Sequence, residues 1–168
     1  MSLFLILLAA GESKRLKSTV PKPFLKVNGK SLLELSYESF DSVNKIKKTV
    51  IVYNKKHKKY LSKLYLGNSL KITGGRSRQE STFIALEKIK KMDCKKVLIH
   101  DAARPNPSKK LIIEIINKLN YNHAVVPIIK TNDATKRFEK HLIFKNIKRS
   151  TLGFSQTPQG FTFTKIYK

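Results

Sequence analysis

The sequence predicts an α/β fold in which a parallel sheet is covered by helices on both faces. Apolar, β-branched runs of strand length, such as residues 48–53 and 96–99, recur along the 168 residues. Segments with the apolar period of amphipathic helices lie between these runs. Strands that alternate with helices are typical of a parallel sheet that is buried on both faces. Residues 130–150 lack the helical period, and their loose alternation predicts a β-hairpin or arm that projects from the domain.

The first apolar run, residues 3–8, leads into the small-residue turn Ala9-Ala10-Gly11, and two cations follow at Arg15 and Lys22. A strand that ends in such a turn presents backbone N–H groups where open α/β sheets bind ligands. Small residues let a triphosphate approach the main chain, and the cations can neutralise its oxygens. We interpret this stretch as a nucleotide-binding loop, although the turn by itself fits a purely structural strand equally well. A signal peptide is not expected, because no cationic region precedes the run, which is also too short to span a bilayer.

Helix caps and turns mark the elements that follow. Residues 27–30 predict a turn, and Ser31 with Glu34 forms a capping-box signature for a helix over residues 31–40. Ser77 with Glu80 forms a second such signature, for a helix that continues to Met92. The remaining expected elements are a strand at 48–53, a helix at 55–64, a strand at 70–73 before Gly74-Gly75, a strand at 96–99 before His100-Asp101, a helix from Ser108 to Leu119, a strand at 123–128 and a helix opening at Thr164. With no repeat and no linker, we expect one domain over residues 1–168, with its arm at about 130–150.

The chain is strongly basic, since 35 Lys and Arg against 11 Asp and Glu give a net charge of +24. Such a charge is compatible with nucleic-acid binding. The lysines are spread along the whole chain, however, and residues 55–59, the densest group, contain no interleaved aromatic side chains. We therefore interpret the excess as a solvated surface that also attracts small polyanions, and we do not expect a nucleic-acid partner or a membrane partner. The single cysteine, Cys94, excludes an internal disulfide and fits a reducing compartment.

Three loops are expected to meet at one edge of the sheet, because the strands that begin at Leu3, Leu70 and Lys96 should be parallel. These loops deliver two cations, a glycine pair, the Ser81 hydroxyl and the Asp101 carboxylate. Asp101 can accept a hydrogen bond from a substrate hydroxyl or help to place Mg²⁺ through water. Taken by itself, however, its position favours a turn residue that pairs only with Arg104.

In this order, the segments LLAAGESKRL, PKPFL, GGRSRQES, HDAARP and QTPQGF resemble the 2-C-methyl-D-erythritol 4-phosphate cytidylyltransferase family. The opening segment by itself suits any sugar-phosphate nucleotidyltransferase, and the later ones narrow the choice. The resemblance implies a three-layer Rossmann-like nucleotidyltransferase sheet with a projecting β-arm, and a cytoplasmic bacterial homodimer joined through that arm. It also implies transfer of CMP from CTP to 2-C-methyl-D-erythritol 4-phosphate, with release of pyrophosphate and with Mg²⁺ as the divalent cofactor.

The resemblance further implies roles for individual residues. Arg15 and Lys22 are expected to be catalytic, because they match the pair that stabilises charge on the α-phosphate. The expected CTP contacts are Ala9, Ala10, Gly11, Gly75 and Ser81, and the expected sugar-phosphate contacts are Asp101, Ala102, Arg104, Thr157 and, from the arm across the dimer, Arg149. No residue is assigned firmly as a metal ligand, because Mg²⁺ on a nucleotide is held mainly by the phosphates, with Asp101 as a candidate. Since a phosphate monoester is already ionised near neutral pH, His100 need not act as a base.

Several features depart from the family pattern. Ser13 stands where many members have a glycine, Arg76 replaces an acidic residue, and Ala134 replaces a threonine of the arm. Members also continue past the QTPQ segment with an acidic stretch and a later lysine that positions the sugar phosphate. We therefore expect the chain to be a fragment, or the front of a longer protein such as a fusion with the cyclodiphosphate synthase. By itself it is expected to be weakly active or inactive.

Other functions stay open at this level. Ribitol-5-phosphate cytidylyltransferases share most of these motifs, and so do other sugar-phosphate nucleotidyltransferases. From a different class, the chain fits a non-catalytic basic domain that binds a nucleotide or nucleic acid.

Overall fold

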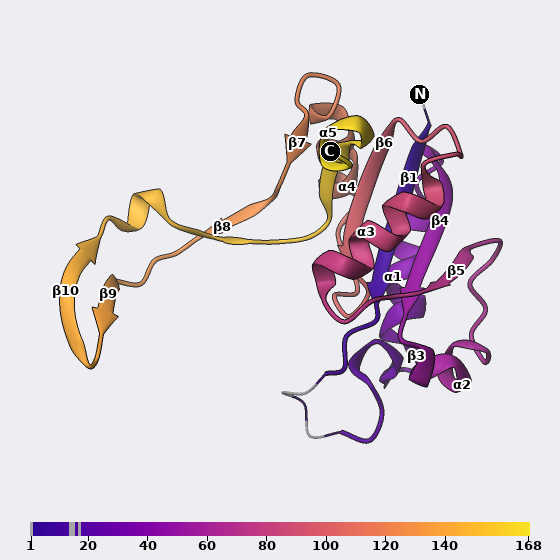
Figure 1. The fold of residues 1–168 in the computed structure, drawn as a ribbon, viewed down its shortest axis with the longest axis horizontal. Helices are drawn as coiled ribbons and strands as arrows, with labels where there is room; N and C mark the ends of the chain where they lie inside the picture. The colour runs from indigo at the N-terminus through magenta and orange to yellow at the C-terminus, as the bar shows by residue number, and fades with distance from the viewer. Residues whose placement is uncertain (1, 14–15, 17) are drawn as a thin grey trace.

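A six-stranded sheet forms the centre of the computed structural model, which describes residues 2–13, 16 and 18–168. Its strand order is β5-β4-β1-β6-β12-β7 (Figure 1). The bounds are Leu3–Ala9 for β1, Ile46–Tyr53 for β4, Leu70–Thr73 for β5, Lys96–Asp101 for β6, Ala124–Val125 for β7 and Gln159–Thr162 for β12. β1 pairs in parallel with both β4 and β6, and β4 pairs in parallel with β5. The three expected loops therefore leave the sheet at the same edge.

The sheet is mixed, which corrects the expectation of an entirely parallel one. β12 lies antiparallel to β6 on one side and to β7 on the other. The single strand expected at 123–128 is instead split into β7 and β8 (Ile128–Lys130), because Pro127 between them has no N–H to donate to a continuous ladder. Gly160 of β12 has no side chain, which lets the strand pack closely under α4 (Lys109–Lys118) and its C-cap. A Cβ added at Gly160 would lie 2.7 Å from Leu119 and 2.8 Å from Ile115.

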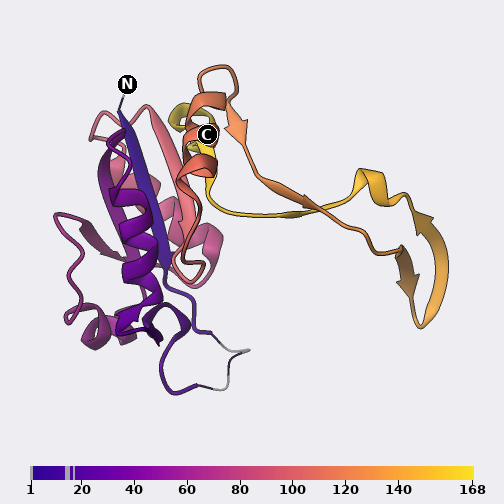
Figure 2. The same ribbon diagram turned by 180° about the vertical axis from the view of Figure 1, so that it is seen from behind.

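Helices cover both faces of the sheet, as predicted. Alternate residues of β1 point to opposite faces, because the side-chain period of a strand is two. Leu5 and Leu7 belong to the apolar cluster that includes α1 (Leu32–Asp41) and α4, whereas Ile6 belongs to the cluster that includes α3 (Arg78–Ile89) and α5 (Phe163–Ile166). Figure 1 shows α3 in front of the sheet, and Figure 2 shows α1 in front when the molecule is turned.

The helix caps are partly as predicted. Ser31 and Glu34 form a reciprocal capping box at the start of α1. The Ser77 hydroxyl accepts from the Glu80 N–H at the start of α3, but the Glu80 carboxylate accepts from the Arg76 N–H instead of closing a second box. The helix expected over residues 55–64 is shorter and consists of η2 (Lys55–His57) and α2 (Lys58–Leu61). The turn expected at 27–30 joins two short strands, β2 (Lys26–Val27) and β3 (Lys30–Ser31).

Two antiparallel ribbons form the arm, which projects away from the sheet (Figures 1 and 2). β8 pairs with β11 (Gly153–Ser155), and β9 (Thr135–Glu139) pairs with β10 (Leu142–Ile147). The short helix η3 (Arg149–Thr151) lies between β10 and β11. The hairpin expected within residues 130–150 is therefore confirmed. Among the described residues, no helix has the length and apolar character needed to cross a membrane.

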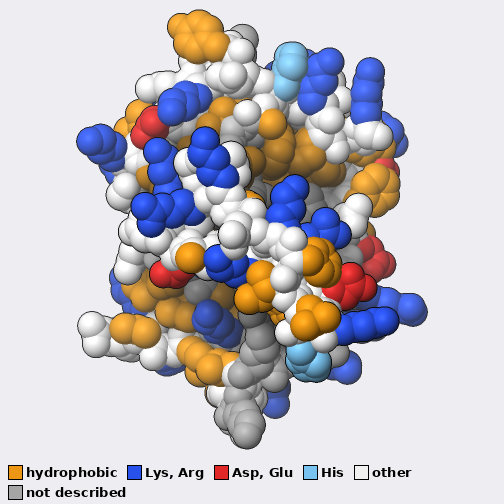
Figure 3. Space-filling model, turned by 90° about the vertical axis from the view of Figure 1, so that its left-hand side faces the viewer, with side chains coloured by type: hydrophobic (Ala, Val, Ile, Leu, Met, Phe, Trp, Pro, Cys, Tyr) orange, Lys and Arg blue, Asp and Glu red, His pale blue; other side chains and the backbone are white. Residues whose placement is uncertain are grey.

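The arm carries many large apolar side chains that are exposed. Figure 3 looks at the side from which the arm projects and shows apolar groups there among many lysines and arginines. Exposed apolar side chains gathered on one element are typical of a protein–protein contact. On the arm they are Ile128, Ile129, Phe138, Leu142, Ile143, Phe144 and Phe154.

One buried hydrogen bond ties α1 to the loop after β6. The Ser36 hydroxyl donates to the Ala102 carbonyl at 2.9 Å, and both residues are fully buried. We expect Ser36→Ala to lower the free energy of unfolding by about 1–3 kcal/mol, because the buried carbonyl loses its hydroxyl donor. Urea unfolding followed by circular dichroism measures this change.

Ser39→Ala is the matched control, because the Ser39 hydroxyl donates to the Leu35 carbonyl within the same helix. That carbonyl is an ordinary helix acceptor, so the change should be within about 0.5 kcal/mol. Equal losses for the two variants would show that the Ser36 bond does not stabilise the loop.

Candidate functional site

The site is built where the strand order reverses. The chain runs from β1 outward to β4 and β5, and then returns to place β6 on the other side of β1. Ligands of open α/β sheets bind at such switch points, beyond the carboxyl ends of the strands. Leu8 of β1 is the register partner of Asp101 of β6, and the Ala102 N–H donates to the Leu8 carbonyl at 3.0 Å. The turn after β1 and the turn after β6 are thus adjacent.

The loop after β1 returns to the sheet through a short helix, η1 (Lys22–Phe24). Ser13 has a φ of +54°, in the left-handed region that favours glycine. The Ser13 hydroxyl accepts from the Lys22 N–H at 2.8 Å and so closes the loop on itself. Phe24 is buried and stacks on Tyr60 with 5.4 Å between the ring centroids, which anchors the end of the loop.

The loop therefore holds the Lys22 backbone in place and leaves its side chain exposed. Ala9 at the end of β1 is buried, Ala10 is half-buried and Gly11 is exposed, so the expected nucleotide turn lies at the rim of the sheet. Arg15, the other expected catalytic cation, lies outside the described residues.

The glycine pair lies beside this turn. The Gly74 N–H donates to the Tyr53 carbonyl at 2.8 Å, and an added Cβ at Gly74 would lie 2.8 Å from the Ala10 Cβ. No larger residue fits between the two loops there without displacing one of them. The Gly75 N–H donates to the hydroxyl of buried Ser81 at 3.1 Å. The structure thus places Ser81 behind the loop, where it supports the Gly75 backbone.

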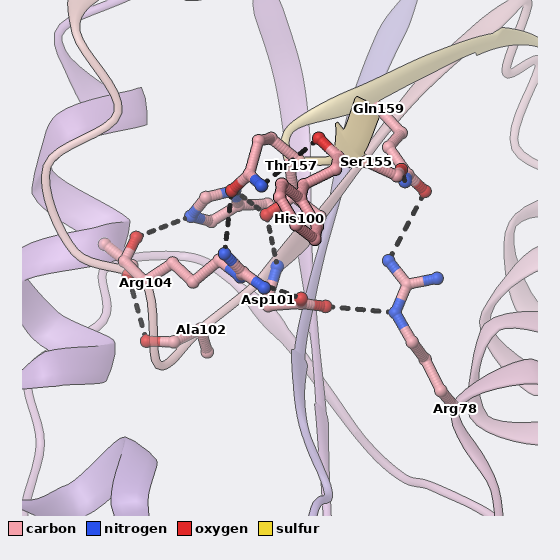
Figure 4. Close-up of polar contacts among 11 residues, drawn as sticks. Arg78, His100, Asp101, Ala102, Arg104, Ser155, Thr157 and Gln159 are labelled. Atoms are coloured by element: carbon pink, nitrogen blue, oxygen red, sulfur yellow. Dashed lines mark hydrogen bonds and ion pairs between the residues drawn. The ribbon is translucent and has the colours of Figure 1, made fainter. Parts of the chain in front are cut away.

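A charged cluster occupies the turn after β6 (Figure 4). The Asp101 carboxylate accepts from Arg78 Nε at 3.0 Å through one oxygen and from Arg104 Nε at 3.3 Å through the other. Two guanidinium groups and one carboxylate leave one net positive charge, which suits an anionic ligand. The alternative in which Asp101 pairs only with Arg104 is therefore wrong. Figure 4 shows that Arg78 reaches the cluster from α3, on the opposite side from Arg104.

Sequence reasoning did not single out Arg78. The sequence does contain features that point to Arg78 as a site residue. It follows the glycine pair and is the first residue of a capped helix at the edge where the three loops meet. Glutamines complete the cluster, since Arg78 donates to Gln159 at 3.4 Å and Arg104 donates to Gln156 at 2.9 Å. A hollow of about 720 Å³ lies between α3 and β12, with Arg78 and Gln159 in its wall. The Arg78 side of the cluster is therefore open to a small molecule.

Thr157 joins the cluster through a buried histidine. The Thr157 hydroxyl lies 3.0 Å from His100 Nδ1 and accepts from the Asp101 N–H at 3.4 Å. His100 is 1% exposed, its Nε2 lies 2.8 Å from the Arg104 carbonyl, and its ring packs against Phe40. Burial lowers the pKa of His100 to about 4, so the ring is neutral near pH 7.

The structure does not bring Arg149 to this cluster within one chain. Arg149 lies in η3 on the projecting arm (Figure 1), where its guanidinium donates to the Asn132 carbonyl at 3.3 Å. Asp101, Ala102, Arg104 and Thr157 do lie together, as expected.

The donor set is a poor one for a metal held by protein alone. In residues 2–13, 16 and 18–168, no group of three or more His, Cys, Asp and Glu is arranged to hold a metal ion. Both oxygens of Asp101 are already engaged by arginines. The residues fit a metal that arrives on phosphates, with Asp101 at most a ligand through water.

Comparison with known proteins identifies what this chain resembles. The family model described as "IspD: 2-C-methyl-D-erythritol 4-phosphate cytidylyltransferase" matches residues 3–168. The bifunctional enzyme IspD/IspF of Pelagibacter ubique is 45% identical over 163 residues, which are 97% of this chain and 44% of that protein. The 2-C-methyl-D-erythritol 4-phosphate cytidylyltransferase of Clostridium beijerinckii is 34% identical, over 97% of this chain and 74% of its own length.

Solved structures agree with the sequence matches. The bifunctional IspDF from Campylobacter jejuni has a TM-score of 0.83 at 30% identity, and the match covers 98% of this chain and 42% of that one. The 4-diphosphocytidyl-2C-methyl-D-erythritol synthase from Anaerococcus prevotii has the same TM-score of 0.83 at 29% identity, with 99% and 72% covered. The chain thus spans less than half the length of the bifunctional relatives.

His100 makes the stability of this chain depend on pH in a predictable direction. The ordinary pKa of a histidine in an unfolded chain is about 6.5, above the value of about 4 that burial causes here. Between these values the unfolded chain binds a proton that the folded chain excludes, so the free energy of unfolding falls as the pH decreases from about 6.5 towards 4. The loss from this group is on the order of 3 kcal/mol at most.

Urea unfolding of the wild type and of His100→Gln at several pH values tests this expectation. The variant lacks the titrating group, so its stability should fall less steeply over that window. Carboxylates elsewhere titrate in both proteins and cancel in the comparison. Parallel pH profiles would contradict a depressed pKa for His100.

Proposed function

Because the chain belongs to the 2-C-methyl-D-erythritol 4-phosphate cytidylyltransferase family, we propose that it transfers CMP from CTP to 2-C-methyl-D-erythritol 4-phosphate and releases pyrophosphate. The observation that carries the proposal is the meeting of three loops at the switch point of the sheet, with Leu8 paired to Asp101. The loop after β1 lets a ligand come close to the backbone and supplies Lys22, and the loop after β6 supplies the Asp101 cluster. Together they offer a place for a nucleotide beside a place for a second anion.

CTP would lie against the turn after β1 and the glycine pair. Ala9, Ala10 and Gly11 carry no side chain that blocks a phosphate, and Gly74 keeps the two loops in contact. The Ser81 hydroxyl fixes the Gly75 backbone, which can then meet the base or ribose. Ser81 thus acts on CTP through the loop that it supports.

Catalysis of the proposed reaction would depend on neutralising negative charge. An oxygen of the sugar phosphate forms a bond to the α-phosphorus, the bond from that phosphorus to the bridging oxygen breaks, and its electron pair leaves with pyrophosphate. Because the attacking phosphate is already ionised, the barrier lies in bringing two polyanions together. Lys22, and Arg15 by its match to the family motif, would offset the charge that grows on the α-phosphate.

The sugar phosphate would bind at the Asp101 cluster. Arg78 and Arg104 attract its negative charge, while their shared contact with Asp101 keeps both guanidinium groups in fixed positions. Mg²⁺ would arrive bound to the triphosphate of CTP and would neutralise part of its charge. A cytoplasmic bacterial setting belongs to it as well, since it suits both a CTP-consuming reaction and the free thiol of Cys94.

A homodimer formed through the arm completes the proposed site. The arm projects from its own sheet with exposed apolar side chains, and Arg149 lies on it far from Asp101 in sequence. A second copy would cover the apolar surface and would bring its Arg149 to the sugar phosphate of the first copy. Two-fold pairing of identical surfaces is the commonest form of such assembly.

Pyrophosphate release from CTP, with either 2-C-methyl-D-erythritol 4-phosphate or ribitol 5-phosphate as acceptor, tests the activity and the choice of sugar. Single-turnover conditions with protein in excess allow a slow reaction to be followed. We expect turnover with the methylerythritol phosphate and much less with the ribitol phosphate. Equal rates with the two acceptors, or a faster rate with the ribitol phosphate, would contradict the proposed substrate.

Lys22→Ala tests the proposed catalytic cation. We expect the single-turnover rate to fall by about 10²–10³, because one group that stabilises the developing charge is lost. Lys88→Ala is the matched control, since Lys88 is also an exposed lysine but lies in the last turn of α3. An equal effect of both variants would point to general loss of positive charge rather than to catalysis by Lys22.

Mixing two variants tests the shared site. Lys22→Ala and Arg149→Ala should each be nearly inactive, because each damages every site of its own homodimer. After subunit exchange, half of the dimers are mixed and hold one intact site, so about one quarter of the wild-type rate should return. Leu142→Asp, which places a charge on the exposed apolar arm, should give a monomer by sedimentation velocity. Absence of recovery in a mixture shown to exchange would exclude a site shared in this way.

A further inference from the structure

The buried imidazole of His100 has no role in the proposed chemistry, yet it contacts two elements of the site. We propose that His100 is a positioning residue that fixes the direction of the Thr157 hydroxyl, so that Thr157 meets the sugar phosphate as an acceptor for a substrate hydroxyl and not as a donor to a phosphate oxygen. The identity of this ligand rests on the proposed function. The direction of the hydroxyl rests on geometry alone.

The contact with Arg104 fixes which ring nitrogen carries the proton. His100 Nε2 lies 2.8 Å from the Arg104 carbonyl oxygen, and a carbonyl can only accept. Nε2 therefore carries a hydrogen. The ring lies against Phe40 with 5.0 Å between the centroids and is 1% exposed, so a second proton is disfavoured. Nδ1 is then a bare acceptor, as the neutral imidazole requires.

A bare Nδ1 determines what the Thr157 hydroxyl does. Thr157 Oγ1 lies 3.0 Å from Nδ1, so its hydrogen points at the ring. The same oxygen accepts from the Asp101 N–H at 3.4 Å. A hydroxyl has one hydrogen and two lone pairs, so a single lone pair remains for a ligand. Thr157 can offer that lone pair to a donor and has no hydrogen for an anion.

This direction of the Thr157 hydroxyl makes the two sides of the site suit different groups of the ligand. A sugar hydroxyl can donate to Thr157, whereas a phosphate oxygen placed there would face a lone pair. If the hydroxyl turned to a phosphate, Nδ1 would be left as a buried acceptor without a partner, at a cost of about 1–3 kcal/mol. The arginine side of the same turn carries the positive charge. The phosphate group therefore belongs near Arg78 and Arg104, and a hydroxyl of the sugar belongs near Thr157.

Two variants of His100 separate its two contacts. The amide of Asn reaches the position of Nδ1, so His100→Asn keeps an acceptor for Thr157 and loses the donor to the Arg104 carbonyl. The amide of Gln reaches the position of Nε2, so His100→Gln keeps that donor and loses the acceptor. Thr157→Val removes the hydroxyl, and Thr157→Ser keeps it.

Titration calorimetry with the sugar phosphate, in the presence of a non-hydrolysable CTP analogue, measures the effects on binding. We expect His100→Gln and Thr157→Val each to raise the dissociation constant about tenfold, with the affinity for the CTP analogue unchanged. The double variant should be no weaker than either single one, because both remove the same contact. His100→Asn and Thr157→Ser should stay within about twofold of the wild type. A larger loss in His100→Asn than in His100→Gln, or additive losses in the double variant, would overturn the proposal.

A second measurement needs no substrate. Nitrogen NMR of the protein labelled in histidine should show one bare and one protonated nitrogen for His100, assigned by the signal lost in His100→Gln, with no change between about pH 5 and pH 8. A proton on Nδ1 would overturn the proposal whatever the activity. A proton on Nε2 in a chain that binds no sugar phosphate would instead contradict the proposed function and leave the hydroxyl direction intact.

Sugar phosphates that lack one hydroxyl at a time identify the donor. One such analogue should bind the wild type and Thr157→Val equally, because the partner of Thr157 is then absent from both complexes. If Thr157→Val weakens every analogue by the same factor, then Thr157 does not accept from a sugar hydroxyl, and the proposal is wrong.

Discussion

The parallel pairing of β1 with β6 is the constraint on which the rest of the site depends. β1 lies between β4 and β6, and its register sets Leu8 opposite Asp101. The Ala102 N–H that bonds to Leu8 then joins the turn after β6 to the turn after β1. A shift of one residue would turn the side chains of β1 to the wrong faces of the core and would also separate the two turns. Packing and ligand binding therefore require the same register.

The charged groups of the site are held in a fixed arrangement, although the chain as a whole is strongly basic. A net charge of +24 attracts any polyanion, but it does not by itself make a site. The site differs from the rest of the surface because Asp101 holds two arginines in fixed directions. Preorganised cations stabilise a reacting anion more than mobile lysines do, since little side-chain entropy is lost when the ligand binds.

Much of the fold could be predicted from local patterns. The apolar runs predicted β1, β4, β5 and β6, and Ser31 with Glu34 predicted the start of α1. The mixed sheet could not be predicted this way. β12 carries only a few residues of weak pattern beside Pro158, and it becomes a strand because it fills the space between β6 and β7. Ser13 departs from the glycine of the family pattern, and its φ lies in the left-handed region that favours glycine. Its hydroxyl, which glycine lacks, accepts from the Lys22 N–H, and no local pattern predicts that bond.

The sequence by itself determined the strands and helices, the loops that carry Lys22, the glycine pair and Asp101, and the family to which the chain belongs. These features depend on residue type and short spacing, which a linear pattern contains. Only the tertiary structure decided that Arg78 reaches Asp101, that Ser81 supports the glycine loop from behind, and that His100 directs the hydroxyl of Thr157. Each of these contacts joins side chains whose partners are chosen by the packing of separate elements, and hydrogen-bond direction exists only once both partners are in place.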